Sequence, residues 1–178
     1  MKNLFWLSGL FIVLFFRCAG NKAFDTQKIS SPVISQKTDT LADKIIKTEI
    51  RIIPGKHFVW KKDGAGKFYP VLAPADGFAV SITKRIDLVH PLPDSGMDYV
   101  VLFNLPKTID KKEFIDRELK KIDTFSGFMA FHPDSGYHPA KKGKIKIEPD
   151  LKHHRILITI DLAEKHTETI NGRYEVKI

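Results

Sequence analysis

The sequence has very little cysteine. Cys18 is the only one among 178 residues, so no disulfide can form within the chain. Any folded part must therefore be stabilised by burial of apolar side chains, and hydrophobic residues make up 43% of the chain. Beyond the first 17 residues, about one domain's length of chain remains. A domain near that size buries roughly two-thirds of its unfolded surface, so one self-sufficient core is expected.

Sequence motifs of catalysis are also lacking. Ser95 and Ser135 lie near acids and histidines, but neither lies in the Gly-x-Ser-x-Gly pattern that exposes a hydrolase nucleophile. The histidine spacing matches no specific metal motif. The sequence therefore predicts no catalytic residue and no cofactor.

No apolar run is long enough for a helix to cross a bilayer, which needs roughly 20 residues. The longest region, Leu4 to Phe16, instead suits the apolar core of a secretory signal, roughly 7–15 residues. Lys2 precedes it, and Arg17 and Cys18 follow it directly. We therefore expect an N-terminal export signal.

An apolar run that ends at a single cysteine resembles a bacterial lipoprotein signal, of the loose type found in Bacteroidota. The resemblance implies that residues 1–17 are a signal peptide, that the thiol of Cys18 carries a diacylglycerol and that its new amine is acylated. Each buried CH₂ contributes about 0.8 kcal/mol to membrane binding, so several acyl chains would hold the protein almost permanently. Two alternatives stay open: an ordinary secretory signal cut nearby, and an uncleaved N-terminal anchor.

The residues after Cys18 bear on location. Ala19 differs from the Asp that retains related lipoproteins at the inner membrane, and Asp25 is isolated rather than part of an acid-rich export cluster. The resemblance implies a lipid-anchored protein of the bacterial cell envelope, at the outer membrane facing the periplasm, with surface exposure as the alternative. Residues 18–44 are mostly polar and show no sustained apolar period, so we expect a lipidated flexible tether.

The formal net charge is +8, and two cations but no acid lie in the first 17 residues, which leaves +6 for the rest. A basic protein can meet anionic lipid, glycan or nucleic acid. The lysines are scattered, however, and an exported, tethered protein has little access to nucleic acid. We expect the membrane as a partner through the lipid anchor, with a protein, glycan or anionic lipid as a further partner.

Residues 45–178 are expected to form a mainly β domain. Apolar and polar residues alternate with period two in Ile46–Ile52, Phe78–Val89, Ile156–Leu162 and Arg173–Ile178. Tyr99–Phe103 is a continuous apolar run, typical of a central strand with both faces covered. Short turn signals separate the strands, so the sequence predicts an antiparallel β-sandwich or a barrel-like domain with one short helix.

The helix is expected from about Lys111 to Ile122. Asp110 followed by Glu113 resembles a capping box, and Phe114 and Leu119 continue at helical spacing. Two turns are expected elsewhere, at Pro54-Gly55 and at Pro74–Gly77.

The segment Lys144 to Ile178 is similar to the C-terminal part of small β-rich Bacteroidota lipoproteins of uncharacterised function. The similarity lies mainly in the closing motif Asn171–Lys177. It implies no catalytic residue.

Two sets of residues are candidates for a site. Imidazoles with a carboxylate can hold Zn²⁺ or Cu²⁺, and the loop after Phe131 carries His132, Asp134 and His138. Aromatic residues with polar tips and a basic loop suit binding, which selects Trp60, Tyr137, Lys141 and Lys142. The sequence thus predicts a non-catalytic binding or envelope-assembly module, with a metal-dependent or hydrolytic enzyme as the alternative.

Overall fold

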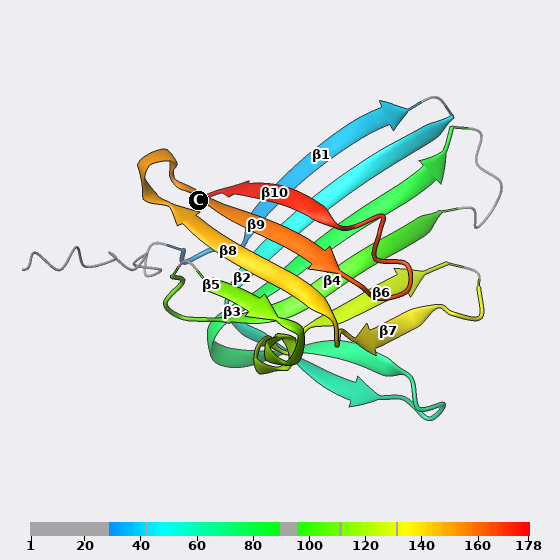
Figure 1. Ribbon diagram of the computed structural model, residues 1–178, viewed down its shortest axis with the longest axis horizontal. Coiled ribbons are helices and arrows are strands. Elements are labelled where there is room, and N and C mark those ends of the chain that lie inside the picture. Colours follow the sequence, from blue (N-terminus) through cyan, green and yellow to red (C-terminus); the bar gives the residue numbers. More distant parts are fainter. Residues whose placement is uncertain (1–28, 42, 90–95, 111, 131) are drawn as a thin grey trace, which may run out of the picture.

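The computed structural model describes residues 29–41, 43–89, 96–110, 112–130 and 132–178. Within these ranges the protein consists of two antiparallel sheets that pack face to face, with short 3-10 helices (Figure 1). The larger sheet also closes on itself at one end, because its last strand pairs with the third. The expected fold, an antiparallel β-sandwich or barrel-like domain with one short helix, is confirmed.

The larger sheet has the order β1-β2-β3-β4-β6-β7. β2 and β3 are its longest strands, at 19 and 21 residues. The strands are β1 (Val33–Leu41), β2 (Lys44–Lys62), β3 (Phe68–Leu88), β4 (Met97–Pro106), β6 (Phe125–Met129) and β7 (Gly136–Pro139).

The smaller sheet has the order β10-β9-β8-β5 and covers one face of the larger one (Figure 1). Its members are β5 (Lys112–Ile115), β8 (Gly143–Asp150), β9 (Arg155–Leu162) and β10 (Gly172–Lys177). The 3-10 helix η3 (Leu151–His153) connects β8 to β9, and a second one, η2 (Asp116–Ile122), leads from β5 to β6 of the larger sheet.

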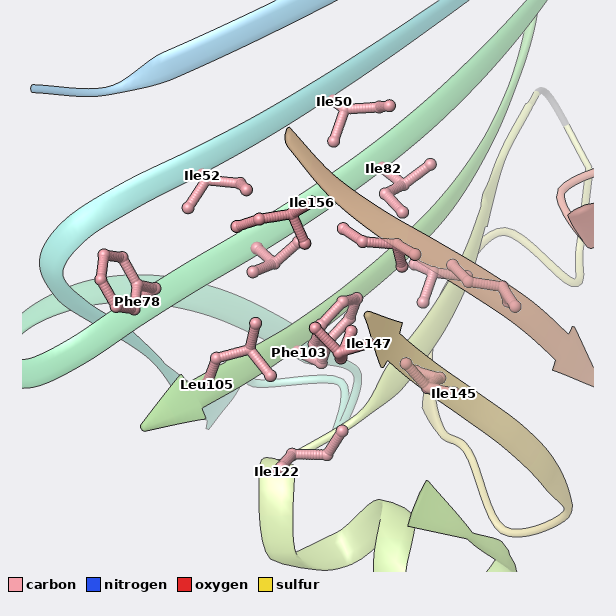
Figure 2. Close-up of a cluster of buried hydrophobic side chains, with 14 of the residues drawn as sticks. Ile50, Ile52, Phe78, Ile82, Phe103, Leu105, Ile122, Ile145, Ile147 and Ile156 are labelled. Carbon is pink, nitrogen blue, oxygen red and sulfur yellow. The ribbon is translucent and has the colours of Figure 1, made fainter. Parts of the chain in front are cut away.

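The main core lies between the two sheets. Alternate side chains of each strand point into it, as the period-two pattern predicts, and Figure 2 shows Ile52 of β2 beside Ile156 of β9. Full burial of one such side chain stabilises the fold by about 1.5–3 kcal/mol. The members with no measurable exposure include Ile52, Val80, Ile82, Val101, Phe103, Ile145, Ile156, Ile158 and Val176.

A second, smaller core lies on the opposite face of the larger sheet. Ala79, Val100 and Leu102 point to that side and pack with Phe58 and Trp60, which come from the end of β2. Both faces of β4 are therefore buried, and the expectation of a central strand at Tyr99–Phe103 is confirmed for Val100 to Phe103.

The second core is covered because β2 and β3 bend together. The register between them shifts at Pro54/Lys56, and Gly55 adopts a left-handed φ of 68°. On β3, a Cβ at Gly77 would lie 2.4 Å from His57 Nε2 and 2.4 Å from the carbonyl oxygen of Leu105, so only glycine fits. The two expected turns, at Pro54-Gly55 and Pro74–Gly77, are wrong: both lie inside continuous strands, which bend there without reversing.

Asn104 fastens the bent part of β2 to β4. Its side-chain oxygen accepts from the backbone N–H of Phe58 at 2.7 Å, and its side-chain NH₂ donates to the carbonyl oxygen of Phe58 at 3.0 Å and to Asp123 at 3.1 Å. Asn104 is only 5% exposed. The side-chain amide of Asn104 thus pairs with the backbone of Phe58 in the way that a neighbouring strand would. Without it, the N–H and the carbonyl oxygen of Phe58 would be buried without partners.

The helix expected at Lys111–Ile122 is shorter and of another kind. Lys112–Ile115 form β5, which pairs with Ile147–Lys144 of β8, and only Asp116–Ile122 are helical, as η2. The capping box predicted at Asp110 and Glu113 does not form because Glu113 lies in β5, and Ile115, which precedes η2, provides no side-chain cap either. The first turn of a helix would leave backbone N–H groups at Lys112–Ile115 without hydrogen-bond partners. Pairing with the edge of β8 provides such partners, which explains why a strand forms there instead of a helix.

The expected tether at residues 18–44 also differs from the structure. Ile29 is 7% exposed and belongs to the main core, and Val33–Leu41 form β1, which pairs along its whole length with β2. β1 is an edge strand with largely exposed, polar side chains, so it lacks the apolar pattern of a core strand. The part of the expected tether before Ile29 lies outside the described residues.

Replacement of Asn104 with alanine should destabilise the protein by about 2–3 kcal/mol, because both backbone groups of Phe58 would be buried without partners. The free energy of unfolding can be measured by urea denaturation. Thr38→Ala, on the exposed face of β1, is the control and should change it by less than about 0.5 kcal/mol. Equal effects of the two substitutions would refute the role given to Asn104.

Candidate binding cleft at the end of the sandwich

A cleft of about 350 Å³ lies between the β6–β7 hairpin of the larger sheet and the loop after β9 of the smaller one. In Figure 1 the β6–β7 turn is at the right-hand end of the molecule, and the loop after β9 is at the right-hand end of the smaller sheet. The lining side chains are mainly polar or titratable around one aromatic ring: Ser126, Phe128, Asp134, His138, Lys141, Glu164, Lys165 and His166, with Gly127 and Pro139.

The loop after β9 is fixed by two of its own side chains. The side-chain amide of Asn171 accepts from the N–H of Leu162 and donates to its carbonyl oxygen, both at 2.9 Å. The buried hydroxyl of Thr167 lies 2.7 Å from the carbonyl oxygens of Leu162 and Glu164. These bonds hold Glu164, Lys165 and His166 in one place, so the wall they form is preorganised.

Asp134 is the centre of a charged cluster in the cleft. Its carboxylate forms an ion pair with Lys165 and lies 3.6 Å from both Nδ1 of His132 and Nε2 of His166. The Lys165 ammonium, with a smaller contribution from the nearby His166, holds the pKa of Asp134 below its ordinary value of 3.8. The carboxylate is therefore charged throughout the neutral range.

His166 has an unusual position. Its backbone φ is 66°, in the left-handed region, and its ring stacks on Phe128 with a centroid distance of 4.4 Å and an interplanar angle of 20°. Its Nε2 is buried, makes no hydrogen bond to the described residues and lies 3.6 Å from the Asp134 carboxylate. His166 therefore belongs to the charged cluster around Asp134.

Glu164 links the cleft to the basic loop before β8. Its carboxylate accepts from the backbone N–H groups of Lys141 at 2.7 Å and Lys142 at 3.0 Å. The side chain of Lys141 lines the cleft, and both lysines are exposed. Because both acids of the cleft already have internal partners, Lys141 is available to a ligand.

The three residues predicted to bind metal lie in the same part of the structure. His132 and Asp134 are close together and His138 lines the same cleft, but no three His, Cys, Asp or Glu residues in the described ranges form a group that could hold a metal ion. Sequence reasoning did not select His166, although its Nε2 lies 3.6 Å from Asp134. The two residues are 32 positions apart, and no sequence motif links them.

Trp60 and Tyr137, which the sequence suggested as binding residues, pack together against the second core. The Trp60 ring stacks on Phe125 with a centroid distance of 3.5 Å, and the Tyr137 ring lies 5.6 Å away. Tyr137 also covers Gly127, where a Cβ would lie 2.7 Å from its ring. Burial raises the pKa of Tyr137. Packing therefore accounts for these aromatics, and Lys141 is the predicted binding residue that lines the cleft.

Cys18, the predicted lipidation site, lies outside the described residues. In the ranges that the structure does describe, no helix is long and apolar enough to span a membrane.

Comparisons with known proteins give no relative for this chain. No protein-family model, no curated protein and no solved structure matches it. The cleft itself offers the exposed side chain of Lys141, the cluster of Asp134 with Lys165 and His166, and the Glu164 carboxylate, all around one aromatic ring. This arrangement suits the binding of a polar ligand or of a partner's polar side chains.

Lys165→Ala should raise the pKa of the Asp134 carboxyl group towards 3.8, because the largest contribution to its lowering is removed. NMR titration of the side-chain carboxyl carbon measures this value. The ion pair should stabilise the fold above pH 3.8, the ordinary value, and this stabilisation should vanish as the pH falls through the lowered pKa. Wild type and variant should therefore converge in stability in strong acid.

Lys61→Ala, at an exposed site on the bent hairpin, is the matched control and should leave the titration of Asp134 unchanged. An unaltered Asp134 titration in Lys165→Ala would show that the ion pair is absent in solution.

Proposed function

We propose that this chain is a lipid-anchored cell-envelope protein that acts as a non-catalytic binding or envelope-assembly module. The observation that carries the proposal is the N-terminal sequence, in which an apolar run ends at the only cysteine, Cys18. Acylation would give this thiol a use in a chain that has no second cysteine to pair with.

The start of the folded domain supports an anchor at Cys18. Ile29 is already buried in the main core, only eleven residues after Cys18. A fully extended chain covers at most about 3.3–3.6 Å per residue, so the domain would be held within about 40 Å of the lipid. Such a short connection suits a protein that works at the membrane surface rather than far from it.

The cleft supports a binding role. The first described residues are at the left-hand end of the molecule in Figure 1, whereas the β6–β7 turn is at its right-hand end and the loop after β9 is at the right-hand end of the smaller sheet. A domain held at its left-hand end would present the cleft to the compartment beyond the membrane. There Lys141 and the other residues that line the cleft would meet the partner.

The alternative is a metal-dependent or hydrolytic enzyme. One observation favours it: His132 and His166 both lie 3.6 Å from the same oxygen of Asp134. Lys165 occupies that oxygen, however, and a metal ion would have to displace its ammonium. The binding module is therefore the function that the geometry supports better.

Protein isolated from the membranes of its native host should have an intact mass that corresponds to an acylated chain from Cys18 to Ile178. Growth with labelled palmitate should label the wild type, while Cys18→Ser should carry no label because the acceptor thiol is gone. Ser30→Ala is the control and should be labelled normally. An unlipidated mass for the wild type would overturn the anchor and leave a secreted binder or an uncleaved anchor.

Elemental analysis separates the binding module from the metal-dependent enzyme. The purified protein should contain no stoichiometric metal, and the double substitution of His132 and His138 with alanine should leave its thermal stability in the presence of zinc unchanged. Stoichiometric metal that is lost in the double variant would favour the enzyme instead.

A further inference from the structure

One end of the sandwich brings three features together. The first described residues, the η3 turn between β8 and β9, and the C-terminal end of β10 all lie at the left-hand end of the long axis in Figure 1. The contacts agree with this view: Val33 pairs with Ile52, Ile52 lies beside Ile156 in Figure 2, and the N–H of Ile178 donates to the carbonyl oxygen of His154 at 2.8 Å. We call this the chain-entry end.

The η3 turn exposes an apolar side chain at its tip. Leu151 is 42% exposed although it is a large aliphatic residue, and Lys152, His153 and His154 follow it, all exposed. His154 adopts a left-handed φ of 48°, which ends the turn and returns the chain to β9. An exposed aliphatic side chain next to a lysine can enter a lipid headgroup layer while the ammonium group stays with the anionic headgroups.

The charges of the chain-entry end favour an anionic surface. Lys152 and Lys177 are exposed, and neither forms an ion pair with another described residue. The nearby acid, Asp150, accepts from Arg155 at 2.9 Å and from His153 at 2.8 Å. These partners, Arg155 foremost, lower the pKa of Asp150 to about 2, so its carboxylate is charged. Arg155 also pairs with Glu175 at 2.8 Å, and with Lys152 and Lys177 these five groups carry a net charge of 3 − 2 = +1.

We propose that the chain-entry end is a membrane-docking surface, on which Leu151, Lys152 and Lys177 contact an anionic phospholipid bilayer. The inference rests on the lipid anchor proposed above, because eleven residues from Cys18 to Ile29 bring this end to the bilayer first. Docking fixes the orientation of the domain, and the cleft at the other end then points away from the membrane.

The surface can be tested without the lipid. The chain from Ala19 to Ile178 contains every described residue, and its partition onto vesicles can be measured by co-sedimentation. It should bind vesicles of phosphatidylcholine with phosphatidylglycerol, should bind phosphatidylcholine alone far less, and should be released by high salt.

Lys152→Glu should lower the partition onto the anionic vesicles by about tenfold, because one attraction becomes a repulsion. Lys61→Glu makes the same change of charge on the bent hairpin, at the other end of the molecule, and should leave the partition unchanged. If both variants lost the same amount of vesicle binding, the effect would be due to net charge alone, and the proposed docking surface would be refuted. Circular dichroism of both variants checks that they fold.

A second measurement does not depend on charge. Since Cys18 is the only cysteine, the Ala19–Ile178 chain has none, and a single cysteine can carry an environment-sensitive fluorophore. Leu151→Cys should show a blue-shifted emission on anionic vesicles. Tyr69→Cys, equally exposed at 41% on the bent hairpin, should show none. A shift at position 69 but not at 151 would place the membrane contact elsewhere.

The two proposals can fail separately. A lipidated protein whose unlipidated chain does not bind anionic vesicles would refute the docking surface and keep the anchor. An unlipidated native protein whose chain binds the vesicles through Leu151 and Lys152 would refute the anchor and keep the surface.

Discussion

Burial of both faces of β4 is the constraint on which the rest of this fold depends. Val101 and Phe103 point to one side of the larger sheet, and Val100 and Leu102 point to the other. One covering sheet can bury only one of these faces. The second cover comes from the larger sheet itself, because β2 and β3 continue past a bend and fold over it. β2 and β3 are long, at 19 and 21 residues, because each contributes to the larger sheet and also to the cover over its second face.

The bend has consequences beyond the second core. The folded part of β3 reaches β7, where Phe68 pairs with Tyr137, and this pairing closes the larger sheet at one end. The closure sets the position of the β6–β7 hairpin, whose outer side forms one wall of the cleft. The other wall depends on Thr167 and Asn171, which fix the loop after β9. Residues far from the cleft, Asn104 among them, therefore help to determine its shape.

Period-two alternation predicted most of the strands, because each of them has one face in the main core. The period-two pattern failed to predict strands that are held mainly by backbone pairing with a neighbouring strand. β1 is a polar edge strand that is held by backbone pairing with β2, so its side chains carry little pattern. At Lys112–Ile115, pairing with β8 outweighs a local capping signal. Pro54 and Pro74 are tolerated inside strands because they flank the irregular register of a bend.

The cleft was predicted only in part for a different reason. His132, Asp134 and His138 are close in sequence, so a loop pattern could select them. His166 and Glu164 reach the cleft from the other sheet, and such a contact depends on the register between two sheets, which no local pattern encodes. Lys141 was selected for its charge, and its place beside the cleft results from the bonds of Glu164 to the backbone of that loop.

The order of elements along the chain gives the domain a direction. β1 starts at Val33, opposite Ile52, so the N-terminal segment enters the fold at the end where η3 and β10 also terminate. The β6–β7 turn and the loop after β9 end at the opposite side, because antiparallel strands reverse there (Figure 1). An anchor before Ile29 would therefore act on one end and leave the other free. Any partner that enters the cleft would then meet Lys141 and His166 without approaching the bilayer, so anchoring and binding need not compete for the same surface.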